Sequence, residues 1–178
     1  MPKHRRRNVS RPIYRMMLQA DASIRPWLED HRPKLALVAM IDNATKKVWV
    51  LFRTYEDTSG YLTVLQEICL NEGIPMELYT DKRNVSKDKR ELSTEDQLAG
   101  KERISNFKGI TDHLGIELNQ ADSPQAKGRI EWLFETLQDQ ILVKILREAG
   151  TQTLEDVNPV LQVYLPQHNQ LFIKKAAE

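Results

Sequence analysis

The most specific segment of this chain is Asp122-Ser123-Pro124-Gln125-Ala126-Lys127-Gly128-Arg129-Ile130-Glu131, which opens its clearest helical pattern. Ser123 is a good N-cap, and Pro124 suits the first helical position. Apolar residues recur at helical spacing from Ile130 to Ile145, and Gly150 ends the pattern. We therefore expect one long helix that carries Glu131 in its opening turns.

Upstream of this helix, short apolar runs alternate with helical patterns. The turn formers of residues 42–47 separate two apolar runs, which predicts a β-hairpin buried deep in a sheet. The other expected elements are an extended segment 14–21, a helix from Thr58 or Ser59 to 71, a strand 76–80, a loop 82–102, a helix 104–114, a strand 116–118, and a final helix 154–165 interrupted by Pro159. This order predicts a mixed α/β sheet with helices on its faces and is compatible with a ribonuclease-H-like fold.

Three acidic residues stand where their carboxylates could converge. Asp21 ends the first predicted strand, Asp81 ends the strand after the first helix, and Glu131 lies on the long helix. Ligand sites in open α/β sheets gather at the carboxyl ends of strands, where two of these acids are expected. Most acidic residues are solvated surface groups, so spacing alone does not select three of the 25 in the chain.

Converging carboxylates would repel one another unless they held a cation or a proton. Their oxygen ligands suit Mg²⁺ or Mn²⁺, because hard cations prefer oxygen. Two such ions ~4 Å apart can activate an attacking oxygen and stabilise a leaving one in phosphodiester displacement. The three acids are therefore candidates for a two-metal site.

The sequence around each acid resembles the integrase core of DDE transposases in the retroviral-integrase superfamily, most closely the insertion-sequence transposases of the ISNCY group. Those proteins contain a Ser-Pro-Gln-Ala-Lys-Gly-Arg-Val-Glu string followed by Thr-Leu-Gln-Asp. This chain has nearly the same string ending at Glu131, and it has Thr-Leu-Gln-Asp at residues 136–139. Residues 79–85 and 19–23 resemble the family's second and first acid regions, and the resemblance spans about residues 15 to 170.

The resemblance implies a ribonuclease-H-like fold in which Asp21, Asp81 and Glu131 are the catalytic DDE residues and the ligands of two Mg²⁺ or Mn²⁺ ions. It implies cutting and joining of DNA, with transposon ends and target DNA as partners, in a homo-oligomer or with a full-length transposase. The chain departs from the family pattern at five positions: Ala20 and Ala22 where Met and Gly are typical, Asn106 where Gln is expected, and Trp132 and Phe134 in place of the usual Arg and Asn. Family members also carry an N-terminal helix-turn-helix region, so we expect a truncated transposase core.

Basic residues near the helix start predict a DNA contact. Lys127 and Arg129 lie where the helix dipole disfavours cations, and a phosphate bound there, beside Gln125, would explain them. The alternative is ion pairing of these cations with Asp122 or Glu131 at the surface.

The N-terminal residues form a basic arm. Residues 1–15 hold six basic residues and no acid, which leaves 20 basic against 25 acidic residues elsewhere. Such an arm, with Arg5, Arg6 and Arg7 at its centre, is typical of contact with phosphate backbone, although a solvated tail fits the composition equally well.

The chain is expected to divide into a basic arm or linker 1–14, an integrase-like core 15–150, and a C-terminal helical extension and tail 151–178. It has no apolar run near the ~18 residues of a membrane helix and no signal-peptide core. A single cysteine excludes an internal disulfide, and no His or Cys spacing suits zinc. We expect a cytoplasmic, nucleoid-associated protein without a membrane partner.

Three functions remain open from the sequence. The first is a DDE core that performs metal-dependent strand cleavage and joining. The second is a non-catalytic remnant that binds DNA or a full-length transposase and inhibits it. The third is a structure-selective nuclease on the same fold, which would cut branched or hybrid DNA without joining strands.

Overall fold

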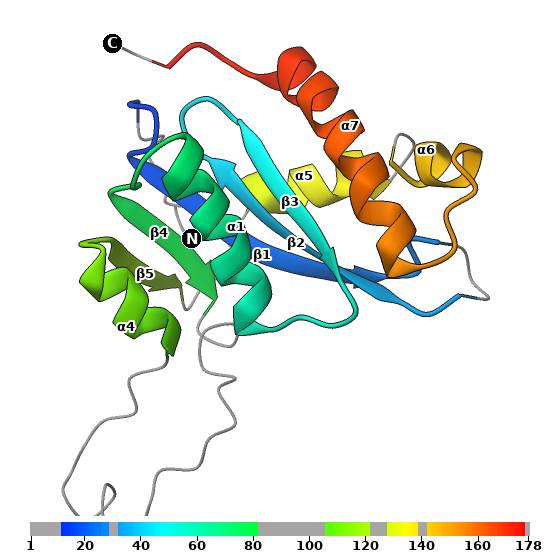
Figure 1. The fold of residues 1–178 in the computed structure, drawn as a ribbon. Helices are drawn as coiled ribbons and strands as arrows, with labels where there is room; N and C mark the ends of the chain where they lie inside the picture. The colour runs from blue at the N-terminus through cyan, green and yellow to red at the C-terminus, as the bar shows by residue number, and fades with distance from the viewer. Residues whose placement is uncertain (1–11, 29–31, 82–105, 122–127, 139–141, 177–178) are drawn as a thin grey trace, which may run out of the picture.

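A mixed five-stranded sheet forms the centre of the computed structural model, which describes residues 12–28, 32–81, 106–121, 128–138 and 142–176 (Figure 1). The strands are β1 (Met17–Arg25), β2 (Leu35–Asp42), β3 (Val48–Arg53), β4 (Glu77–Asp81) and β5 (Glu117–Ala121). Their order is β3-β2-β1-β4-β5; β1 and β3 pair antiparallel with β2, while β4 pairs parallel with β1 and β5. The helices are α1 (Thr58–Asn71), α4 (Asn106–His113), α5 (Gly128–Thr136), α6 (Leu142–Glu148) and α7 (Leu154–Phe172).

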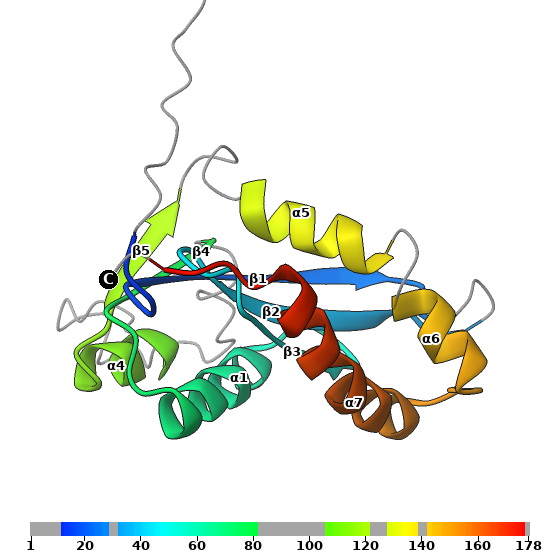
Figure 2. The ribbon, with the colours of Figure 1, turned by 90° about the horizontal axis from the view of Figure 1, so that it is seen from above.

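Helices cover both faces of the sheet, as predicted. Helix α5 lies over one face, and α1 and α4 lie over the other (Figure 2). The alternation of side chains along β2 divides the core accordingly, since Val38 and Met40 join the cluster that includes α1, while Leu37 and Ala39 join the cluster that includes α5. Residues of equal parity on β1 and β2 therefore face the same helices.

Two boundaries of predicted elements were wrong. Strand β1 continues to Arg25 instead of ending at Asp21, because residues 22–25 keep pairing with β2. Helix α1 is capped by Asp57 and not by Thr58 or Ser59; the Asp57 carboxylate accepts the Gly60 N–H at 2.7 Å.

The expected single helix from Ser123 to Gly150 was also wrong. The structure has α5, a short π-helical turn at Leu137 and Gln138, and then a separate helix, α6. Leu137 and Leu142 are both fully buried in the α5-side core, so tertiary packing favours the break over a continuous apolar stripe. Gly150, with φ of 68°, ends α6 in the left-handed conformation that glycine adopts without strain.

The hairpin forms as predicted, but it does not lie deep in the sheet, because β3 is an edge strand. Helix α7 lies along this edge (Figure 1). The Asn169 amide exchanges two hydrogen bonds with the backbone of Val48, at 2.8 and 2.9 Å. The Asn158 amide does the same with Phe52, at 2.9 and 3.1 Å. Two side chains, about three helical turns apart, thus take the place of a neighbouring strand.

Helix α7 is longer than the predicted helix 154–165, and neither Pro159 nor Pro166 interrupts it. A proline inside a helix removes a backbone hydrogen bond and costs about 3 kcal/mol. Three features offset this cost: the buried stripe of Val157, Leu161 and Tyr164, the two asparagine pairs with β3, and a capping box at Thr153.

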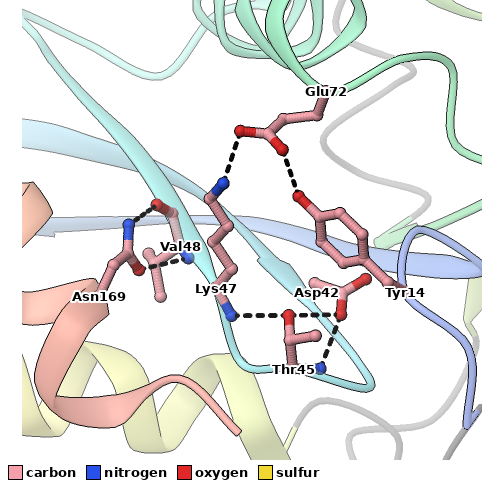
Figure 3. Close-up of polar contacts among 7 residues, drawn as sticks. All are labelled: Tyr14, Asp42, Thr45, Lys47, Val48, Glu72 and Asn169. Atoms are coloured by element: carbon pink, nitrogen blue, oxygen red, sulfur yellow. Dashed lines mark hydrogen bonds and ion pairs between the residues drawn. The ribbon is translucent and has the colours of Figure 1, made fainter. Parts of the chain in front are cut away.

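Asp42, the first of the predicted turn formers 42–47, connects the hairpin turn to its surroundings. Asp42 is fully buried, and its carboxylate accepts hydrogen bonds from the Arg15 N–H at 2.9 Å and from the Thr45 N–H and hydroxyl at 2.7 Å each. Lys47 and Tyr14 both donate to Glu72 at 2.5 Å, which joins the turn and the lead-in segment to the end of α1 (Figure 3). The hydrogen bond from Lys47 is the main reason that the pKa of Glu72 is lowered.

Buried His168 predicts an acid-sensitive contribution to stability. Its Nδ1 lies 3.0 Å from the Tyr164 hydroxyl, and its Nε2 has no hydrogen-bond partner among the residues that the structure describes. Burial lowers the pKa of the imidazole from 6.5. The unfolded chain therefore binds a proton at a higher pH than the folded chain, so stability falls as the pH drops below about 6.5. We expect His168→Phe to flatten this part of the stability profile, measured by urea unfolding at a series of pH values. An unchanged slope would contradict this role for His168.

Candidate active site

Two of the predicted catalytic acids lie on adjacent parallel strands. Met17, Leu18 and Gln19 of β1 pair with Glu77, Leu78 and Tyr79 of β4. In each pair the β4 residue is numbered 60 higher than its β1 partner (77 − 17 = 60), and Asp81 is likewise numbered 60 higher than Asp21. Continuing this register by two residues brings Asp21 level with Asp81, the last residue of β4.

Both aspartates face the side of the sheet that α5 covers. Asp21 pairs across β1 and β2 with Ala39, which belongs to the α5-side core. Asp81 points to the same side, because residues level with each other on parallel strands share a face. Both residues are partly exposed, so they are accessible from solvent. The Asp21 carboxylate accepts the Ala22 N–H at 3.0 Å.

Glu131 lies on α5, which packs against β1 and β2 (Figure 2). Its neighbour Ile130 is buried against the sheet, whereas Glu131 is exposed. Helix α5 thus carries the third acid above the face of the sheet toward which Asp21 points. However, no group of three acidic, histidine or cysteine residues that could hold a metal ion occurs in the part of the chain that the structure describes. The fold provides carboxylates suited to Mg²⁺ or Mn²⁺ on one side of the sheet, but it does not gather all three around one point.

Arg129 makes a contact that the sequence did not predict. Its guanidinium donates a hydrogen bond to the Asn43 carbonyl at 2.7 Å and so ties α5 to the hairpin turn. Burial lowers the pKa of Arg129, and the nearby Asp42 carboxylate opposes this shift; an arginine stays charged in either case. The side chain is half-buried, with part of it accessible to solvent.

The two departures from the family pattern after Glu131 have structural roles. Phe134 is buried in the α5-side core. Trp132 is partly buried and packs edge-on against Phe172, with 5.8 Å between the ring centroids. The Lys46 ammonium lies 4.7 Å from the centroid of the Trp132 ring. These aromatic residues therefore fix α5 against α7 and the hairpin turn. A third aromatic residue, Trp49 of β3, lies in the core with 4% of its surface exposed.

Other predicted sites lie outside the described residues. They are the N-cap and first turn of the long helix, the loop 82–102, and the DNA-contact candidates Gln125, Lys127, Arg5, Arg6 and Arg7.

A pocket at one end of the molecule is lined by residues that include Trp27, Arg32 and Arg147, and none of the three candidate acids lines it. No helix among the described residues is both long and apolar enough to cross a lipid bilayer.

No protein-family model matches the chain, but two transposases are similar to it in sequence. One is the protein y4bF of Sinorhizobium fredii (strain NBRC 101917 / NGR234), which is named provisionally as a transposase. It is 32% identical to this chain over 165 residues, which are 92% of this chain and 35% of that protein. The other is the transposase for insertion sequence IS1202 of Streptococcus pneumoniae, 32% identical over 160 residues, which are 89% of this chain and 33% of that protein. The chain thus spans about a third of the length of these relatives.

Solved structures identify the fold. The catalytic core domain of HTLV-2 integrase, in complex with magnesium and in a trimeric form, superposes with a TM-score of 0.57 at 16% identity and covers 84% of each chain. A chain of the simian T-cell lymphotropic virus intasome, in complex with the PP2A regulatory subunit B56 gamma, superposes with a TM-score of 0.64 at 17% identity. The match covers 93% of this chain and 51% of the intasome chain. The described residues therefore have the fold of a retroviral integrase catalytic core, which is the predicted ribonuclease-H-like fold. The chain is thus similar in sequence to two transposases over about a third of their length, and it has the fold of an integrase catalytic core.

Proposed function

We propose that this chain is the catalytic core of a DNA transposase and performs metal-dependent cleavage and joining of DNA strands. Asp21, Asp81 and Glu131 are its proposed catalytic residues and metal ligands. The observation that carries the proposal is the parallel pairing of β1 with β4; its register, continued by two residues beyond the last pair, would bring Asp21 level with Asp81 on the face that α5 covers. The sequence similarity to two transposases supports the same assignment.

The role proposed for each of these residues follows from its position. Asp21 and Asp81, on paired strands, form the rigid side of the site, and Glu131 completes it from the exposed side of α5. Divalent ions held there would activate the attacking oxygen and stabilise the leaving one. The chain itself would orient the scissile phosphate, first toward water and then toward a 3′-hydroxyl, because positioning carries most of such a reaction. Completion of the site requires Glu131 to approach the aspartates when metal and DNA bind.

Transposon ends and target DNA are the proposed partners, and a homo-oligomer or a full-length transposase is the proposed assembly. The HTLV-2 core in its trimeric form, and the simian T-cell lymphotropic virus protein within an intasome, support assembly for a chain with this fold. We place the protein in the cytoplasm with the nucleoid, where such DNA lies. The arm that includes Arg5, Arg6 and Arg7, together with Gln125 and Lys127, remains a proposed DNA contact.

Incubation of the full chain with labelled DNA and Mn²⁺ or Mg²⁺ tests this function. We expect nicked or joined products from linear DNA that carries a free 3′-hydroxyl, and no product with excess chelator. Cleavage confined to branched or hybrid DNA, without joining, would instead identify a structure-selective nuclease. DNA binding without any product would favour the non-catalytic remnant.

A further inference from the structure

Three cationic side chains gather beside the hairpin turn, on three different elements. Lys46 lies in the turn, Arg129 on α5, and Lys174 just after α7. The Lys174 N–H donates to the Thr45 carbonyl at 2.7 Å, which fixes the backbone of Lys174 against the turn. Arg129 reaches the same turn through its hydrogen bond to the Asn43 carbonyl. We call Lys46, Arg129 and Lys174 the basic cluster.

The positions of these cations are enforced by contacts other than ion pairs. The Lys46 ammonium rests over the Trp132 ring, and its backbone has φ of 66°, an uncommon conformation for a residue with a side chain. Its pKa is lowered by burial first, and then by the charges of Lys174 and Arg129. Lys174 and Arg129 thus lie near enough to the Lys46 ammonium for their charges to disfavour its protonated form.

Among the described residues, no carboxylate forms an ion pair with the basic cluster. Asp42 is the nearby acid, but it is fully buried, and its oxygens accept the hydrogen bonds of Arg15 and Thr45. The cluster remains accessible, because Lys174 is exposed and Lys46 and Arg129 are half-buried. An anion with several acceptor oxygens would turn the mutual repulsion of the three side chains into attraction.

We propose that the basic cluster is a binding site for a backbone phosphate of DNA. The proposal rests on the proposed function, and it adds Lys46 and Lys174 to the DNA-contacting residues. A DNA strand fits better than a small soluble anion, because the cluster is open at the surface and lies at the end of the helix that carries Glu131. A strand held here would run past α5 in the direction of the candidate acids.

The test measures DNA binding by the full chain in the absence of divalent metal. Fluorescence anisotropy gives the affinity at each of a series of salt concentrations. The double variant Lys46→Gln with Lys174→Gln is expected to bind about tenfold more weakly, and its plot of log affinity against log salt should lose about one unit of slope for each lysine removed. Lys174→Gln alone should show half of this change; its side chain is exposed, and its bond to Thr45 comes from the backbone, so its folding is not at risk. Lys144→Gln, at an exposed lysine of α6 that pairs with Glu148 at 3.7 Å, is the matched control and should bind like wild type.

An unchanged affinity and salt slope in both cluster variants would overturn the proposal, and so would an equal loss in Lys144→Gln. Binding of inorganic phosphate that depends on the cluster, without any change in DNA affinity, would identify a small-anion site and would also overturn it. Because binding is measured without metal, failure of strand cleavage leaves this result standing. The two proposals can therefore fail separately.

Discussion

Replacement of Asp81 by Asn is expected to reduce metal-dependent strand cleavage by at least about a thousandfold. Asparagine keeps the size of the side chain and removes its charge, and charge is what a carboxylate contributes to a site that binds divalent ions. Loss of a metal's stabilisation of the transition state is worth several kcal/mol, and each 1.36 kcal/mol is about tenfold in rate. Initial rates of nicking in Mn²⁺, with protein in excess over DNA, give the measurement.

Asp112→Asn is the matched control for this experiment. Asp112 is an exposed acid of α4 that pairs with Lys108 at 2.7 Å, on the opposite side of the sheet from α5 (Figure 2). Its substitution should leave the rate within about twofold, the usual result for a surface pair. Glu131→Gln and Glu135→Gln form a second matched pair on α5, of which only the first should lose activity. Cleavage that survives in Asp81→Asn would rule out the proposed metal site.

Phe52→Ala should produce the largest loss of stability among the substitutions considered. Phe52 is 1% exposed, packs edge-on against Trp27 at 5.7 Å, and lies in the core that α5, α6 and α7 share. Truncation of a buried phenylalanine removes its transfer free energy and leaves a cavity, at a cost of about 3–5 kcal/mol. In a chain of this size the unfolding midpoint should fall by roughly 10 °C, which differential scanning calorimetry would measure.

Tyr55→Ala provides the comparison, because Tyr55 follows the same strand and is 64% exposed. Its free energy of unfolding should change by less than about 0.5 kcal/mol. Equal losses in the two variants would mean that the β3 side of the core contributes less than its burial indicates.

The sequence predicted those features that local patterns determine. The hairpin, α1, α4 and the strand that ends at Asp81 follow from apolar runs, turn formers and glycines, and the structure confirms each of them. The register that pairs β1 with β4 could not be read from spacing, because it is set by two strands that are far apart along the chain. Their expected places at strand ends made Asp21 and Asp81 candidates, and the family resemblance selected them from the other acids of the chain.

The errors share a physical cause, which is that long-range packing outweighs local preference. The apolar stripe after Ile130 predicts one helix, yet burial of Leu137 and Leu142 favours two. Pro159 predicts an interruption, yet contacts along β3 keep α7 continuous. The basic cluster has no motif at all, since Lys46 and Lys174 are 128 residues apart and meet only because α7 returns to the turn.

The asparagine pairs along β3 also limit how copies of this chain could associate. An uncovered sheet edge offers unpaired N–H and C=O groups to a strand from another molecule, which is a common route to aggregation. At Val48 and Phe52 these groups are already occupied by side chains from the same polypeptide. Growth of the sheet from this border would first require α7 to detach, so any assembly of intact molecules is directed to other surfaces.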